Sequence, residues 1–275
     1  MTAIPFKTYD EATEYFGIKF PRRFVDKILI IDNFCQVHQL DTFEILFDTF
    51  GLLRIEGNEA RYQQTPIEFF PFGSIGSDGI HYGFVIHTTD EDDYPAGEIC
   101  PMDDDGIVLI SNTTSELFQN LLCDNSFLDS YPDLYKELNL TNIIGDRERY
   151  DLNGDTSRIS VKQKKDWAFM STKDGAGVFA ENRYFNKQHQ IKYDTLNRHK
   201  GLEEYQNLAN EMKSLGLYAS QLYYLKELYW YEWTNSIIAK DLLNQMLEPY
   251  EKLNRQHLYD TTKWTIETYN QRYGE

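Results

Sequence analysis

The chain has 275 residues, 41% of them hydrophobic, and a formal net charge of −17 at pH 7. Residues 1–150 carry 10 Lys and Arg against 27 Asp and Glu, whereas residues 151–275 carry 17 of each. A negative surface repels phosphate backbones and anionic membranes, which argues against nucleic acid or a membrane as a partner of the first half. The uneven charge predicts two domains, residues 1–150 and residues 151–275.

The cysteines and the first residues bear on the cellular location. Cys35, Cys100 and Cys123 form no CxxC pair, and an odd number of cysteines in a long chain is typical of a reducing compartment. The start of the chain lacks the cationic and apolar regions of a secretion signal, and no stretch approaches the roughly 18 apolar residues of a membrane span. We therefore expect a cytoplasmic protein.

Three helices are predicted near the start of the chain. Thr8 and Glu11 have the spacing of a capping box ahead of a first short helix. Pro21 suits the first turn of a second helix, and Asp41 precedes a third. The apolar run at residues 28–31 fits a helix or a strand, because a short run carries too few periods to distinguish them.

Alternating apolar and polar residues then predict a sheet. The strand-like segments are residues 53–55, 69–73, 82–86, 98–102 and 107–110. A Gly-rich turn separates the second of these segments from the third, and its glycines can adopt positive φ without steric cost. Thr113 and Glu116 form another capping box ahead of a further helix. Helices that flank a sheet in one compact unit predict an α+β fold.

The second half is predicted to be a β-hairpin followed by helices. Residues 167–170 and 178–180 flank a Gly-rich turn, which predicts a hairpin loop of three to five residues. The helical segments are residues 202–215, 217–236, 237–253 and 259–269, with Gly216 and Pro249 as interruptions. The segment around residues 217–238 is apolar on nearly all sides, which predicts a helix buried between layers or, alternatively, an aromatic partner surface.

No catalytic or cofactor motif is complete. Gly73, Gly76 and Gly79 have the spacing GxxGxxG and lead into a strand, whereas a dinucleotide loop has GxGxxG and opens a helix. Ser74 and Ser77 lie outside any GxSxG sequence. The six histidines have no metal-binding spacing, and the acidic runs do not fit an EF-hand. The sequence therefore predicts no metal and no cofactor.

Two carboxylate clusters are the predicted binding surface. Their members are Asp90, Glu91, Asp92, Asp93, Asp103, Asp104 and Asp105. Clustered like charges repel one another, and a cationic partner relieves that repulsion. A rim that is merely solvated is the alternative. Whether the two clusters share one edge of the sheet depends on the strand register.

The order of several short motifs resembles that of the SUKH superfamily, over about residues 5–140. Phe20-Pro21 is similar to the Leu-Pro motif of that family, Phe70-Pro71-Phe72 to its strand-opening Pro-Phe, and Leu117–Leu122 to its closing helix. The Asn-Gly-Gly turn of the family is missing here. Residues beyond about 150 have no counterpart.

The resemblance implies an α+β fold, a non-enzymatic binding role and, for bacterial members, neutralisation of a toxin by direct contact. Such toxins are frequently basic, which is the sign complementary to this chain. We therefore expect an immunity protein that binds a basic toxin domain. One alternative is a regulatory scaffold of the cell-wall-synthesis type. Another is an unrecognised hydrolase that uses His81 or His87 with Ser77 or Asp78 at the Gly-rich turn.

Overall fold

A computed structural model describes residues 4–76, 79–101, 106–123, 126–140, 164–186 and 202–273. The chain divides into two compact units, which consist of Met1–Tyr62 with Phe69–Ser160 and of Gln63–Glu68 with Val161–Glu275. The short segment Gln63–Glu68 thus belongs to the second unit, although the residues on both sides of it belong to the first. The predicted α+β class is confirmed. The predicted domain boundary at residue 150 falls outside the described residues.

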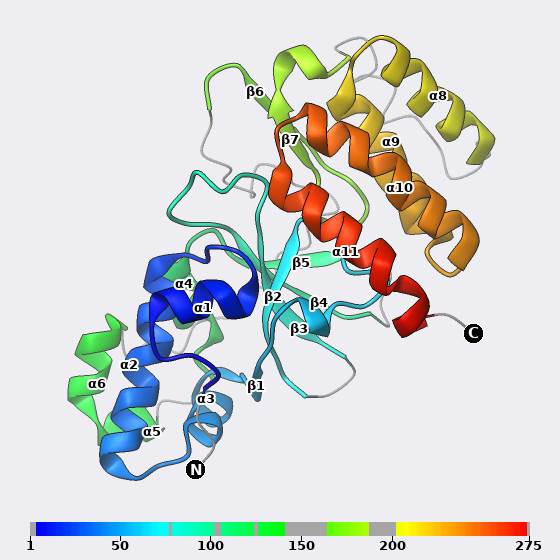
Figure 1. The fold of residues 1–275 in the computed structure, drawn as a ribbon. Helices are drawn as coiled ribbons and strands as arrows, with labels where there is room; N and C mark the ends of the chain where they lie inside the picture. The colour runs from blue at the N-terminus through cyan, green and yellow to red at the C-terminus, as the bar shows by residue number, and fades with distance from the viewer. Residues whose placement is uncertain are drawn as a thin grey trace. The chain divides into compact units, whose positions relative to one another are not determined.

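Three helices open the first unit (Figure 1). They are α1 (Tyr9–Phe16), α2 (Arg22–His38) and α3 (Thr42–Phe50). The Thr8 hydroxyl accepts the backbone N–H of Glu11 at 3.2 Å, and the Asp41 carboxylate accepts that of Phe43 at 3.0 Å. The predicted caps of α1 and α3 are therefore confirmed. The apolar run at residues 28–31 is helical and lies inside α2.

A five-stranded antiparallel meander follows. Its strands are β1 (Arg54–Ile55), β2 (Phe69–Ser74), β3 (His81–Val85), β4 (Ala96–Ile99) and β5 (Ile107–Ser111), in this spatial order. Consecutive strands of a meander run in opposite directions, so successive connections lie at opposite ends of the strands. Residues 86–95 therefore lie at one end of β4, and the segment that follows Ile99 leaves from the other end.

Phenylalanine rings from helices and strands make the core of the first unit. The ring of Phe24 on α2 lies 4.7 Å from that of Phe72 and 5.2 Å from that of Phe84, measured between centroids. Phe118 on α4 (Thr114–Leu121) lies 5.8 Å from Phe24. Two short helices that the sequence did not predict, α5 (Ser126–Ser130) and α6 (Pro132–Leu138), complete the described part of this unit.

Gly83 allows close packing in the middle of the sheet. All residues of β2 and β3 are buried. A Cβ atom added at Gly83 would lie 2.6 Å from the Phe69 ring and 2.6 Å from the Phe70 carbonyl oxygen, which is closer than real Cβ contacts allow. Phe69 therefore occupies the space that any side chain at this position would fill.

The second unit begins its regular structure with a hairpin of β6 (Trp167–Met170) and β7 (Val178–Glu181). Seven residues, 171–177, connect the strands, so the predicted loop of three to five residues is wrong. The longer connection is stabilised by its own side chains. Thr172 Oγ1 accepts the N–H of Gly177 at 2.8 Å, and Asp174 Oδ1 accepts that of Ala176 at 3.0 Å.

In the part of the chain that the structure describes, four helices follow the hairpin and its short helical turn η3 (Asn182–Tyr184). They are α8 (Leu202–Ser214), α9 (Tyr218–Glu232), α10 (Ser236–Lys252) and α11 (Gln256–Tyr273). Helix α9 contacts α8, α10 and β7, and 12 of its 15 residues are buried, which confirms the predicted helix between layers. None of the described helices has the length and apolarity that crossing a membrane requires.

The predicted interruptions between these helices have different outcomes. Gly216 follows α8 with φ of 70°, as expected for a glycine that ends a helix. Pro249 lies inside α10, so the predicted break there is wrong. The proline removes one backbone donor of the helix. The helix nevertheless continues to Lys252, and the Pro249 carbonyl accepts the N–H of Leu253 at 2.9 Å.

The substitution Gly83→Ala is expected to destabilise the first unit by about 1–3 kcal/mol, because the added methyl group overlaps Phe69 and the Phe70 carbonyl. Urea unfolding followed by circular dichroism measures this loss. Gly57→Ala is the matched control, since the nearest atom to its added methyl is the movable carboxylate end of Glu59, at 3.0 Å. Equal unfolding midpoints for the two variants would contradict the packing described for Gly83.

Candidate functional site

The connection between β3 and β4 contains the first predicted carboxylate cluster, and Asp93 attaches it to helix α4. Asp93 Oδ1 accepts the backbone N–H of Tyr94 at 3.1 Å and that of Thr114 at 2.9 Å. It also accepts the Thr114 hydroxyl at 2.5 Å. Thr114 begins α4, where backbone N–H groups have no partner within the helix. Asp93 therefore has a structural role, because it fixes the loop against the start of α4.

The other acids of this loop differ in exposure. Asp90 and Asp92 are exposed, and Glu91 is partly buried. Burial raises the pKa of Tyr94, and the negative charges of Glu91 and Asp90 add to that rise. These two carboxylates therefore lie close enough to the phenol to act on it. The first predicted cluster is one loop with an anchored end at Asp93 and exposed carboxylates before it.

The second predicted cluster, Asp103, Asp104 and Asp105, lies outside the described residues. Its described neighbours, Pro101 and Gly106, lie at the end of β4 opposite the loop of residues 86–95. A strand residue advances the chain by about 3.3 Å, so the four residues of β4 separate the two ends by roughly 13 Å. The loop of residues 86–95 and the described neighbours of the second cluster thus lie at opposite ends of β4.

The Gly-rich turn between β2 and β3 is packed against its surroundings. Gly76 and Gly79 both have positive φ, which confirms the predicted use of glycine here. A Cβ atom at Gly79 would lie 2.8 Å from Pro101 and 3.0 Å from the Tyr62 hydroxyl. Ser77 and Asp78, the turn residues of the hydrolase alternative, lie outside the described residues.

His81 and His87, the histidines of the hydrolase alternative, lie at opposite ends of β3. The Nδ1–H of His81 donates to the Gly79 carbonyl at 2.9 Å, and its ring lies 5.6 Å from that of Phe69. Burial lowers the pKa of His81 to about 4. His81 is therefore neutral at pH 7, and a base with so low a pKa is a weak proton acceptor. Its observed contacts fix the Gly-rich turn to the strand.

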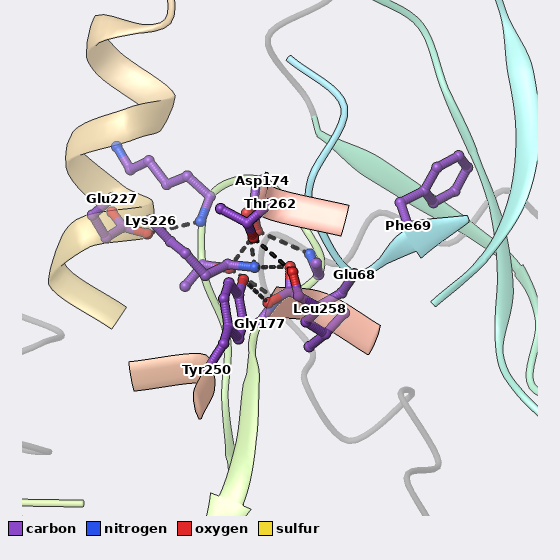
Figure 2. Close-up of polar contacts among 12 residues, drawn as sticks. Glu68, Phe69, Asp174, Gly177, Lys226, Glu227, Tyr250, Leu258 and Thr262 are labelled. Atoms are coloured by element: carbon purple, nitrogen blue, oxygen red, sulfur yellow. Dashed lines mark hydrogen bonds and ion pairs between the residues drawn. The ribbon is translucent and has the colours of Figure 1, made fainter. Parts of the chain in front are cut away.

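A cluster of buried charges in the second unit was not predicted from the sequence. Lys226 on α9 is 3% exposed, and its ammonium group forms ion pairs with the carboxylates of Glu68 and Asp174. The distance from Lys226 Nζ to Asp174 Oδ2 is 3.1 Å. Figure 2 shows the three side chains converging from α9, the segment Gln63–Glu68 and the β6–β7 connection. Burial alone lowers the pKa of Lys226, but the charges of Asp174 and Glu68 outweigh this effect and raise it.

Hydroxyl groups complete the hydrogen bonding of the two carboxylates. The Tyr250 hydroxyl of α10 donates to Glu68 Oε1 at 2.8 Å, and the Thr172 hydroxyl donates to Asp174 Oδ1. The Tyr229 hydroxyl donates to the Gln63 carbonyl at 2.7 Å, which holds the other end of the short segment. Buried ion pairs are tolerated when their remaining polar atoms have such partners. The cluster therefore attaches residues 63–68 to the helices of the second unit.

Glu227, the neighbour of Lys226, is buried beside this cluster. Its Oε1 accepts the backbone N–H of Lys173 at 2.8 Å. Burial raises the pKa of Glu227 to about 7; the hydrogen bond from Lys173 opposes the rise and the nearby charge of Asp174 adds to it. The side chain is therefore half-protonated near neutral pH, whereas an exposed glutamate is ionised.

One sequence signal does indicate the buried cluster. A lysine followed by a glutamate in the middle of an apolar helix needs an oppositely charged partner if the helix is buried. The partner Glu68 lies 158 residues earlier, and no local pattern identifies it. Among the residues that the structure describes, no group of three or more His, Cys, Asp or Glu side chains is arranged to hold a metal ion.

No family model and no curated protein matches this chain. The resemblance to the SUKH superfamily accordingly stays a prediction that rests on the order of its motifs. The geometry offers two features of different kinds, an acidic loop with exposed carboxylates and a buried ion cluster with its partners satisfied. The first suits binding, and the second suits stability.

Replacing Lys226 by methionine is expected to lower the free energy of unfolding by about 3–5 kcal/mol, because Glu68 and Asp174 lose their neutralising cation while staying buried. The matched control is Lys213→Met. Lys213 pairs with Glu248 at 2.5 Å on the surface, where such a pair contributes about 0–1 kcal/mol. Urea unfolding at pH 7 measures both losses. If the two variants lose equal stability, the buried cluster does not stabilise the unit.

The stability of the second unit is expected to fall as the pH rises from 4.5 to about 7, because Glu227 binds its proton more tightly when folded. Its contribution is fully present below pH 4.5 and is lost as the pH approaches 7. The change amounts to about 3 kcal/mol. Glu227→Gln keeps the acceptor for the Lys173 N–H and removes the titration, so this variant should lack that part of the slope. The free energy of unfolding is measured with urea from pH 4.5 to 8 for the unaltered chain and for Glu227→Gln. If it changes equally with pH in both, Glu227 does not cause the pH dependence.

Proposed function

We propose that this chain is a non-enzymatic binding protein whose acidic first unit contacts a basic protein. The distribution of charge carries the proposal. The described residues of the first unit include 8 Lys and Arg against 19 Asp and Glu. Asp90 and Asp92 are exposed on the loop that Asp93 fixes to α4. A loop held in place before binding loses less entropy on association, and opposite charge speeds the encounter.

The motif order supports a narrower form of this proposal, a bacterial immunity protein that neutralises a basic toxin domain by covering part of its surface. A cytoplasmic location belongs to the same proposal. All three cysteines, Cys35, Cys100 and Cys123, are free thiols, which accords with a reducing compartment. The environment of His81 gives no support to the hydrolase alternative, since burial lowers the pKa of the ring and leaves it neutral at pH 7.

Reversing two exposed charges, Asp90→Lys with Asp92→Lys, is expected to slow association with the partner at least several-fold at low salt and to flatten its salt dependence. Asp93 is left unchanged because it stabilises the start of α4. The partner is first obtained by affinity purification from the native cells and identified by mass spectrometry. Association rates are then measured by surface plasmon resonance at several salt concentrations.

The control for this experiment is the double variant Asp10→Lys with Glu14→Lys, both on α1. It has the same net charge, and both of its sites are exposed elsewhere on the first unit. Under the proposal, the loop variant slows association more than this control does. Recovery of an acidic protein or of nucleic acid as the specific partner would contradict the proposal, as would equal rates for the two double variants.

A further inference from the structure

Aromatic side chains gather at the carboxyl end of α2. Phe34 and His38 lie one turn apart on this helix, with stacked rings whose centroids are 4.2 Å apart. Tyr131 lies 4.9 Å from Phe34, and Phe127 on α5 lies 6.2 Å from it. Tyr131 also contacts His38 and Phe127, at 5.3 and 5.0 Å. Each ring thus contacts at least two of the other three.

This cluster is accessible and has an apolar neighbour. Val37 lies on α2, three residues after Phe34 and therefore on the same side of the helix. Its side chain is 69% exposed. His38 is exposed, and Phe34, Phe127 and Tyr131 are partly exposed. We call these five residues the α2 aromatic face. Exposed apolar residues that lie together, unlike scattered ones, mark interaction surfaces.

The helices around the α2 aromatic face are acidic. Helices α3 and α6 contact α2, and α5 contacts both α3 and α6. Together α3, α5 and α6 carry five acidic residues, Glu44, Asp48, Asp129, Asp133 and Glu137, and one basic residue, Lys136. The carboxyl end of α2 adds the negative end of a helix dipole. The surroundings therefore attract cations and repel anions.

Charge narrows the class of molecule that this face accepts. Nucleic acid and anionic lipid are repelled, because both carry negative charge and the surroundings of this face are acidic. A second copy of this chain, with its net charge of −17, is disfavoured as well. A protein segment with both basic and apolar side chains matches the surface, because its apolar groups can cover Val37 and its cations can lie over the rings of Phe34 and Tyr131.

We propose that the α2 aromatic face anchors a basic amphipathic segment of the partner. This inference rests on the proposed function and adds a contact area separate from the acidic loop. The loop is held by α4 through Asp93, and α4 packs against α2 at Phe24. Phe34 lies ten residues beyond Phe24, which is roughly 15 Å farther along the helix. The loop carboxylates attract the partner, and the aromatic face holds it.

The experiment uses the full chain and two synthetic peptides of equal length and charge, both 14 residues long by design. One combines Lys with Leu at helical spacing, and the other replaces each Leu by Ser. The chain should bind the Lys/Leu peptide about tenfold more tightly, in line with the burial of one or two apolar side chains. Fluorescence anisotropy gives both dissociation constants.

Variants then locate the binding site. Val37→Ser, at a largely exposed position, should lower the affinity for the Lys/Leu peptide several-fold and leave the affinity for the Lys/Ser peptide unchanged. Ile237→Ser is the matched control, because Ile237 is 81% exposed in the second unit and should have no effect. The double variant Asp90→Lys with Asp92→Lys should lower the affinity for both peptides at low salt and preserve the ratio of the two affinities.

The outcomes separate this inference from the proposed function. Equal affinity of the unaltered chain for the two peptides, or unchanged binding in Val37→Ser, overturns the aromatic anchor and leaves the acidic loop in place. If neither peptide binds at low salt, both the anchor and the proposed function fail. If Ile237→Ser lowers the affinity for the Lys/Leu peptide more than Val37→Ser does, the apolar contact lies in the second unit and the inference is overturned.

Discussion

The ammonium group of Lys226 is removed from water, and only carboxylates in direct contact can offset the cost of that removal. Asp174 reaches it from the connection between β6 and β7, and Glu68 from the segment Gln63–Glu68. Tyr250 and Thr172 then supply donors to the two carboxylates. One buried charge therefore joins α9, a hairpin connection and a distant segment. Without this neutralisation α9 could not be enclosed on nearly all sides.

The carboxylates of the first unit have two separate uses. Asp32 is buried and accepts hydrogen bonds from Lys7 at 2.8 Å and from Thr42 at 2.8 Å, while Asp93 stabilises the start of α4. Asp90 and Asp92 are exposed. The net charge of a sequence counts all four alike, although only the exposed ones contribute directly to a recognition surface. A binding model for this unit therefore depends on exposure as well as on sign.

Local features were predictable, and distant pairings were not. The caps at Thr8, Asp41 and Thr113 follow from neighbours three residues away, and the strands follow from a period of two. The pairing of Lys226 with Glu68 joins residues that no local pattern relates. For the candidate site, the sequence located the acidic loop but could not show that Asp93 is bound to α4, because that depends on where the following helix begins.

The position of Gln63–Glu68 has a consequence for synthesis on the ribosome. Glu68 is translated 158 residues before Lys226. At roughly 5–20 residues per second, that interval lasts on the order of 10 s. During this time Glu68, at the end of the segment Gln63–Glu68, has no Lys226 with which to pair. The second unit can therefore reach its final form only after most of the chain has been made.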